Sequence, residues 1–159
     1  MSTLQEELPL LAPYLRLPQV ELAIDPEFSM KGGHPPGTVI GTFNNAQDIN
    51  YAAHFLAQLV KEYHLPPKIL VVHRFTEAMV THYRDIKPLP QVEIVMDMDG
   101  WGSPVRKRRT YYDVIYKEPV QFTGIKLFYK NDVKPPSTHM LTPEEVLQLK
   151  PIPIYVQYQ

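Results

Sequence analysis

The chain has 159 residues, with 16 Lys and Arg against 17 Asp and Glu, and it contains no cysteine. This length is most simply one domain, residues 1–159, with a single core. The absence of cysteine excludes disulfides, thiolate nucleophiles and Cys-based metal sites. The one basic cluster, Arg106 to Arg109, lacks the aromatic or glycine-rich companions typical of nucleic-acid binding and is interpreted as a solvated helix face.

The N-terminus is polar and acidic, and no apolar run approaches the length needed to span a bilayer. We therefore expect no membrane span and a cytoplasmic location for the chain as written. If the chain is a fragment of a longer protein, the expectation changes to an exported one.

The first half of the chain alternates helical and strand-like patterns. Leucines at helical spacing favour an N-terminal helix within residues 1–18 despite two internal prolines. Asn44 or Asn45 is the expected N-cap of the longest helix. The predicted elements are a helix over 3–17, a strand over 19–25, a long loop over 29–45, a helix over 46–64 and a strand over 68–74.

The second half continues the alternation, with prolines at the segment edges. Thr76 is the expected cap of the next helix, and the helix after it should turn Val105, Tyr112 and Ile115 inward. Thr142 and Glu145 fit a capping box. The predicted elements are a helix over 77–84, a strand over 91–98, a helix over 104–117, a strand over 123–130, a helix over 143–149 and a strand over 154–159.

Strands that alternate with helices indicate right-handed parallel crossovers. The expected fold class is therefore α/β, with parallel βα repeats and about five strands. Such a sheet resembles the C-terminal half of a (β/α)8 barrel, and an open doubly wound sheet is the alternative. A complete barrel needs about 250 residues, more than the 159 present here.

Polar side chains follow the apolar runs where the predicted strands end, and parallel sheets place their catalytic and ligand-binding groups at that rim. The candidate catalytic residues are Asp25, Glu27, His73, Asp97 and Asp99. Paired carboxylates suit general acid–base chemistry, glycoside hydrolysis or a hard cation. The structural alternatives are a loop cap for Asp25, an ion pair for Glu27, a hydrogen-bonded structural role for His73 and an ordinary turn for Asp97 and Asp99.

Four further residues are candidates for binding a substrate. Arg74 can fix a carboxylate, and Trp101 between two glycines can stack on a sugar ring. Lys126 is expected to point into a barrel interior against Asp25 or Asp97, and Tyr129 follows on the same predicted strand. No His-x-x-x-His spacing occurs, so no resident metal is expected, and Mg²⁺ or Ca²⁺ at the acidic rim is the alternative.

Several segments together resemble a known family, from about residue 15 onward. They are Leu22–Phe28, Pro66–Glu77, Met96–Gly102, Gly124–Tyr129 and the terminal pair Tyr158–Gln159. The combination is similar to the carboxyl-terminal portion of a family of largely uncharacterised bacterial TIM-barrel-like proteins, which are often lipoprotein-like or exported. This chain differs from that pattern by lacking the upstream half and an export signal. The resemblance implies a barrel-type fold and no particular activity.

The leading functional expectation is a carbohydrate-active barrel or half-barrel that hydrolyses a glycosidic bond with two carboxylates. Glu27 is the expected acid, with Asp97 or Asp99 as its partner. The alternative is a non-catalytic binding or assembly subunit that completes a barrel with another chain or a second copy, because open sheets leave strand edges exposed. The expected partners are therefore a small-molecule or glycan ligand and a homo-oligomer or partner chain, without nucleic acid.

Overall fold

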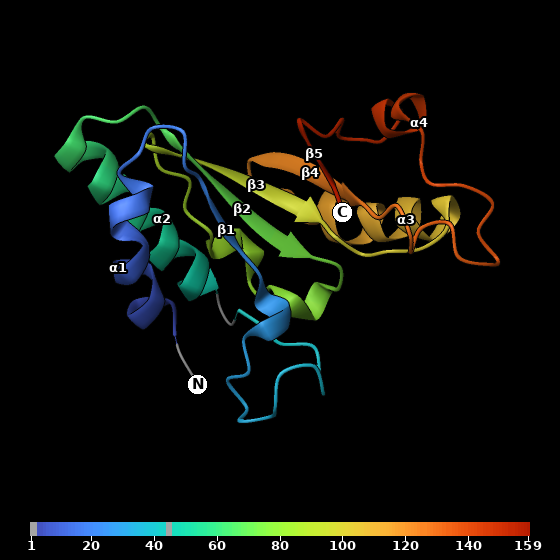
Figure 1. The fold of residues 1–159 in the computed structure, drawn as a ribbon, viewed down its shortest axis with the longest axis horizontal. Helices are drawn as coiled ribbons and strands as arrows, with labels where there is room; N and C mark the ends of the chain where they lie inside the picture. Colours follow the sequence, from blue (N-terminus) through green and yellow to red (C-terminus); the bar gives the residue numbers. More distant parts are fainter. Residues whose placement is uncertain (1–2, 44–45) are drawn as a thin grey trace.

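A computed structural model describes residues 3–43 and 46–159 and shows an α/β fold built on one curled sheet (Figure 1). All five strands of this sheet are parallel and lie side by side in chain order, which is the order of a half-barrel. The strands are β1 (Leu22–Ile24), β2 (Lys68–Arg74), β3 (Val92–Met98), β4 (Phe122–Leu127) and β5 (Tyr155–Tyr158).

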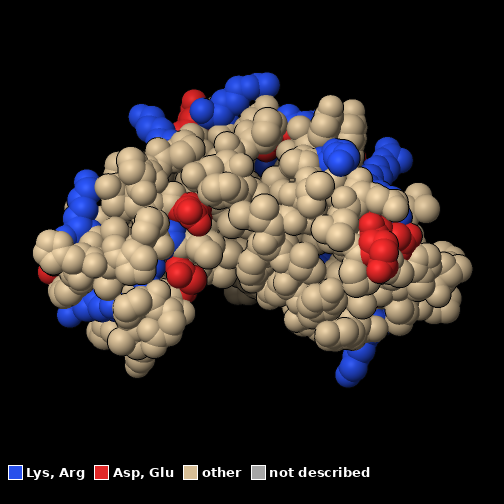
Figure 2. Space-filling view, turned by 90° about the horizontal axis from the view of Figure 1, so that it is seen from above, with Lys and Arg blue, Asp and Glu red and all other residues tan. Residues whose placement is uncertain are grey.

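The α-helices precede the first strand and lie in every connection except that between β2 and β3, which contains only 3₁₀ turns. They are α1 (Leu4–Leu15), α2 (Gln47–Tyr63), α3 (Pro104–Tyr111) and α4 (Pro143–Leu147), with short 3₁₀ turns at Pro26–Phe28, Glu77–Met79 and Tyr83–Asp85. None of the described helices is long and apolar enough to cross a bilayer. Seen from above, the molecule has an arched outline hollowed along one side (Figure 2).

Strand side chains alternate between the two faces of the sheet, so each strand contributes every second residue to the helix-facing core. In β3 these are Ile94, Met96 and Met98, all of which belong to the core cluster together with α2. The intervening residues, Val95 and Asp97, therefore face the concave side. This alternation decides which polar side chains can meet on the concave side.

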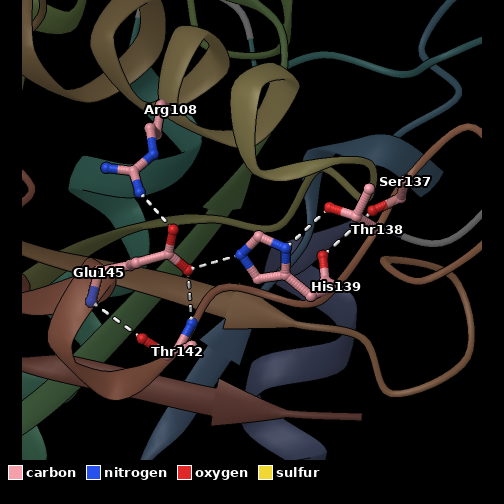
Figure 3. A network of polar contacts seen from close by, with 6 residues as sticks. All are labelled: Arg108, Ser137, Thr138, His139, Thr142 and Glu145. Carbon is pink, nitrogen blue, oxygen red and sulfur yellow. Dashed lines mark hydrogen bonds and ion pairs between the residues drawn. The ribbon is translucent and has the colours of Figure 1, made fainter.

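The capping box predicted for α4 is confirmed and belongs to a larger polar network (Figure 3). The side chain of Thr142 accepts from the backbone of Glu145, and a carboxylate oxygen of Glu145 accepts from the backbone of Thr142 at 2.9 Å. The same carboxylate contacts Arg108 of α3 at 2.8 Å and His139 at 3.0 Å. Glu145 therefore contacts the preceding loop at His139, completes the cap of α4 and links α4 to α3.

Two helix predictions need correction. Residues 77–84 form two separate 3₁₀ turns, and Thr76 makes no side-chain cap. The helix predicted over 104–117 is α-helical only to Tyr111 and continues as a π-helical turn over Tyr112–Tyr116. Ile115 is buried as expected, whereas Val105 and Tyr112 are exposed, because the buried face runs through Lys107, Tyr111, Val114 and Ile115. The cap predicted at Asn44 or Asn45 lies outside the described residues, and the first residue described before α2 is Ala46.

Candidate active site

The carboxyl ends of three strands bring the acidic and imidazole side chains together on the concave face. His73 of β2 pairs in register with Asp97 of β3, which pairs with Gly124 of β4 and, through it, with Tyr155 of β5. The pairing of β1 with β2 ends at Ile24 and Val72, so Asp25 extends the same row beside His73. Four parallel strands and the end of a fifth thus supply one row across the rim.

His73 lies between two buried carboxylates. Its Nδ1 is 2.9 Å from Oδ2 of Asp97 and 3.7 Å from Oδ2 of Asp99. The side chain of Asp97 is completely buried, and those of His73 and Asp99 are more than nine-tenths buried. Asp97 and Asp99 reach the same imidazole because residues two apart at a strand end point to one face.

The polar atoms of this cluster have few hydrogen bonds. Within the described residues, no partner of good geometry contacts either oxygen of Asp97, Oδ1 of Asp99 or Nδ1 of His73. The approach of His73 to Asp97 is therefore close but poorly aligned, and mainly electrostatic. Buried polar atoms without partners are rare in folded proteins and require a specific reason. Such a cluster is poised to bind a polar ligand or to exchange a proton.

The environment raises the pKa of both Asp99 and His73. Burial raises the pKa of Asp99 to about 7, with opposition from His73 and reinforcement from Asp25 and Asp97. Burial alone lowers the pKa of His73, but the contact with Asp97 and the charges of Asp97 and Asp99 outweigh it, so this pKa lies above its ordinary value. The cluster can therefore hold a proton that is exchangeable near neutral pH.

Gly124 makes room for Asp97. A Cβ atom at this position would lie 2.6 Å from Oδ1 of Asp97 and 3.0 Å from Cδ1 of Tyr155. Any larger residue must displace the carboxylate that faces His73. Glycine in the middle of β4 is thus required by the position of the acidic side chain next to it.

Asp25 and Glu27 occupy the β1 side of the rim. Oδ1 of Asp25 accepts a hydrogen bond of 2.8 Å from the backbone of Glu27, which is the capping role that the sequence allowed. Partial burial raises the pKa of the half-buried Glu27, and the charge of Asp25 adds to this effect while Lys126 opposes it. Lys126 also influences His73 and Asp99 electrostatically, so it faces the cluster as predicted.

Arg74 does not join the cluster. It is fully buried toward the helix side, where Nη2 contacts Glu118 at 2.7 Å and the backbone carbonyl of Glu77 at 3.1 Å. Strand alternation explains this placement, because Arg74 follows His73 directly and must point to the opposite face. Its surroundings indicate a structural role in place of the predicted substrate contact.

Trp101 and Tyr129 are exposed on the loops that follow β3 and β4. The ring of Trp101 lies beneath Arg106 and Lys134, each at 5.8 Å, and Tyr129 stacks on Tyr158 at 5.6 Å. Both aromatic rings are therefore accessible to a ligand, but the contacts given above are with α3, the loop after β4 and strand β5, and none is with the acidic cluster.

A buried ion pair beneath the rim was missed at the level of sequence. Lys107 and Asp132 are both fully buried, with Nζ 3.1 Å from Oδ2, so the interpretation of residues 106–109 as a solvated face is wrong for Lys107. Nζ of Lys107 also donates to the carbonyls of Gly100 and Lys126, and Asp132 accepts from the backbone of Gly102. The pair clamps the loop after β3 to β4. The helical spacing of Lys107 with the buried Tyr111 was the available signal.

The cluster does not form a metal site. Among residues 3–43 and 46–159, no three His, Asp or Glu side chains are arranged to hold a metal ion. The predicted alternative of a divalent cation at this rim therefore gains no support.

The arrangement of buried carboxylates around one imidazole is the feature on which a functional interpretation depends. Comparison of the chain with protein-family models, with curated proteins and with solved structures found no match in any of the three.

Proposed function

We propose that the chain is a barrel-type hydrolase that cleaves a glycosidic bond by acid–base catalysis at the rim formed by β1, β2 and β3. The supporting observation is the buried cluster in which His73 and Asp97 accompany an Asp99 carboxyl group with a pKa of about 7. A carboxyl group of this kind keeps its proton at neutral pH and can donate it during a reaction.

The environments of the carboxylates favour Asp99 as the acid, in place of Glu27. Asp99 is buried and has the pKa near neutrality, whereas Glu27 is half-buried and closer to solvent. The proton of Asp99 would pass to the leaving oxygen as the C–O bond breaks. Glu27 would take a proton from the water whose oxygen bonds to the anomeric carbon. Asp97, buried against Gly124, would hold His73 beside Asp99.

The test compares Asp99→Asn and Glu27→Gln with wild type on a panel of oligosaccharides and aryl glycosides. Each substitution should reduce turnover by about 10²- to 10⁴-fold, the range typical of general acid–base groups. Glu93→Gln, which changes an exposed carboxylate on β3, the strand that Asp99 follows, is the matched control and should leave turnover unchanged. Wild-type activity that survives Asp99→Asn would refute the assignment, and a wild-type protein inactive on the whole panel would refute glycoside hydrolysis.

A second candidate is a non-catalytic binding or assembly subunit. The observation that favours it is the pair of sheet edges at β1 and β5, each of which has a single strand neighbour within the described residues. Unpaired parallel edges are templates for further strands. This candidate predicts glycan binding without turnover, measured by calorimetry with the same panel, and a stable complex with a second chain or copy. A protein that releases product from its bound glycan would contradict it.

A further inference from the structure

An apolar groove of about 730 Å³ runs along the free edge of β1. It lies between α1, β1, the segment that follows β1 and the start of α2. Its apolar lining includes Leu4, Leu11, Leu22, Phe28, Met30 and Phe43. The groove touches the acidic cluster only at Asp25, so it is a separate feature that the proposed hydrolysis does not use.

The position of α1 indicates what the groove accommodates. In a parallel sheet, the helix that precedes a strand covers the junction between that strand and its neighbour. Here α1 precedes β1 and packs chiefly against α2, but the described residues supply no strand on that side of β1. Leu11 consequently faces the groove and is 40 % exposed. The groove therefore has the place and lining expected for one more strand, parallel to β1.

The strand at the other edge of the same sheet, β5, has the properties expected of a strand that fills this groove. β5 pairs only with β4 in the described structure, and its residues Val156 and Tyr158 remain exposed although their neighbours Ile125 and Leu127 on β4 are fully buried. If β5 lay beside the β1 strand of another copy, Val156 and Tyr158 would be covered by the α1 helix of that copy.

The charges at the two edges are complementary. Glu7 and Asp25 line the groove, and the one cation among its described lining residues, Lys31, is already paired with Asp48. The segment 146–159, which includes β5, carries Lys150 and no acidic side chain, and Lys126 and Lys130 lie at the end of the adjoining β4. Opposite charges at two docking edges favour encounter and fix their register.

We propose that two copies of this chain form a closed dimer in which β5 of each copy occupies the β1 groove of the other. The twofold axis would coincide with the axis around which the sheet curls. It creates both β5–β1 junctions at once, and the strands of both copies all run in the same direction. Closure removes both free edges, which is why a closed pair is favoured over an open chain of copies. The proposal rests on the assembly function above and is independent of catalysis.

The first test is the mass of the full chain in solution, measured by light scattering at about 1 to 100 µM, a range that covers interfaces of ordinary affinity. We expect twice the chain mass of 18.4 kDa. Val156→Lys on β5 and Phe28→Glu in the groove should each give a monomer, because each places a charge in an apolar contact. Both side chains are exposed in the single copy, so neither change should impair folding. Val105→Lys, an exposed position on α3, is the matched control and should remain dimeric.

Mixing the two variants gives the sharper result. One junction of the mixed dimer is then unchanged, and in the other the introduced lysine faces the introduced glutamate, so dimer mass should return. A wild-type monomer across the whole concentration range would overturn the proposal. A mass that rises without limit, or a dimer unaffected by Val156→Lys, would also overturn it. None of these readouts uses enzymatic activity, so failure of the hydrolase proposal leaves the result intact.

Discussion

The buried carboxyl group of Asp99 should destabilise the protein at alkaline pH, and its removal should reverse that effect. The pKa of Asp99 rises from an ordinary 3.8 to about 7 because of burial, so between these values the folded state binds one more proton than the unfolded state. The free energy of unfolding must therefore fall as pH rises through this interval. At 1.36 kcal/mol per pH unit, the loss is about 2 to 4 kcal/mol after allowance for the charge of His73.

Asp99→Asn replaces the titrating group with a neutral one of the same size. We expect urea unfolding at about pH 5 and about pH 8 to show that the variant gains about 2 to 3 kcal/mol relative to wild type at the higher pH, since about two pH units of the interval lie between them. His73 acts in the same direction, because its raised pKa adds stability that is present at low pH and lost as pH rises through the folded value. Asp99→Asn removes part of that contribution too, so the direction of the result is unchanged.

The control is Glu93→Gln, an exposed carboxylate on β3, which should follow the wild-type dependence on pH. Parallel stability curves for wild type and Asp99→Asn would refute the reasoning. That outcome would show that Asp99 titrates near its ordinary value, and it would remove the main support for Asp99 as a proton donor.

Three further substitutions test the surroundings of the site. Asp132→Asn should cost about 3 to 5 kcal/mol in urea unfolding, because it leaves Lys107 charged and buried without its partner, whereas a cost below about 1 kcal/mol would contradict a dry ion pair. Gly124→Ala should displace Asp97 and move the pKa of the adjacent imidazole down, as measured by NMR titration, and an unchanged titration would refute the close contact. Thr142→Ala should cost about 1 kcal/mol through loss of the capping box, in a thermal unfolding scan that would show no shift if the cap were unimportant.

The sequence predicts the path of the main chain well because the fold depends on local patterns. Apolar runs bounded by proline locate all five strands to within a few residues, and their alternation with helices predicts parallel pairing, which is confirmed. The capping signature at Thr142 is equally local. The π-helical turn at Tyr112–Tyr116 was not predictable in this way, because one extra residue per turn leaves no mark on the spacing of apolar side chains.

The site was only partly predictable for a related reason. A strand end shows which residues reach the rim, and alternation then separates His73, which faces the concave side, from Arg74, which does not. Strand alternation by itself is therefore enough to place His73 at the site and Arg74 away from it. Lys107 is different, because its burial depends on Asp132, a residue far along the chain in a loop without periodicity. A charged residue in a basic cluster gives no local sign that a distant carboxylate will cover it.

The two proposals meet at β1. Asp25 lies at the end of β1, on the row that continues through His73 and Asp97, and β1 is also the strand whose free edge the second copy would cover. A β5 strand in that groove would bring its concave-side residues Tyr155 and Gln157 to the side of the rim on which Asp25 lies. The β1 side of the rim would then consist of residues from both chains, and its acidic side chains would lose their contact with water.

If this junction completes the site, specific activity should depend on protein concentration. Dilution that converts the dimer to monomer should reduce turnover per chain in proportion to the loss of dimer, followed in one buffer by activity and by light scattering. The mixture of Val156→Lys with Phe28→Glu should recover activity that neither variant has alone, while Val105→Lys should match wild type throughout. Turnover per chain that stays constant while the mass falls by half would show that one copy carries a complete site. The acid–base chemistry would then belong to the rim of a single half-barrel, and the groove at β1 would serve assembly only.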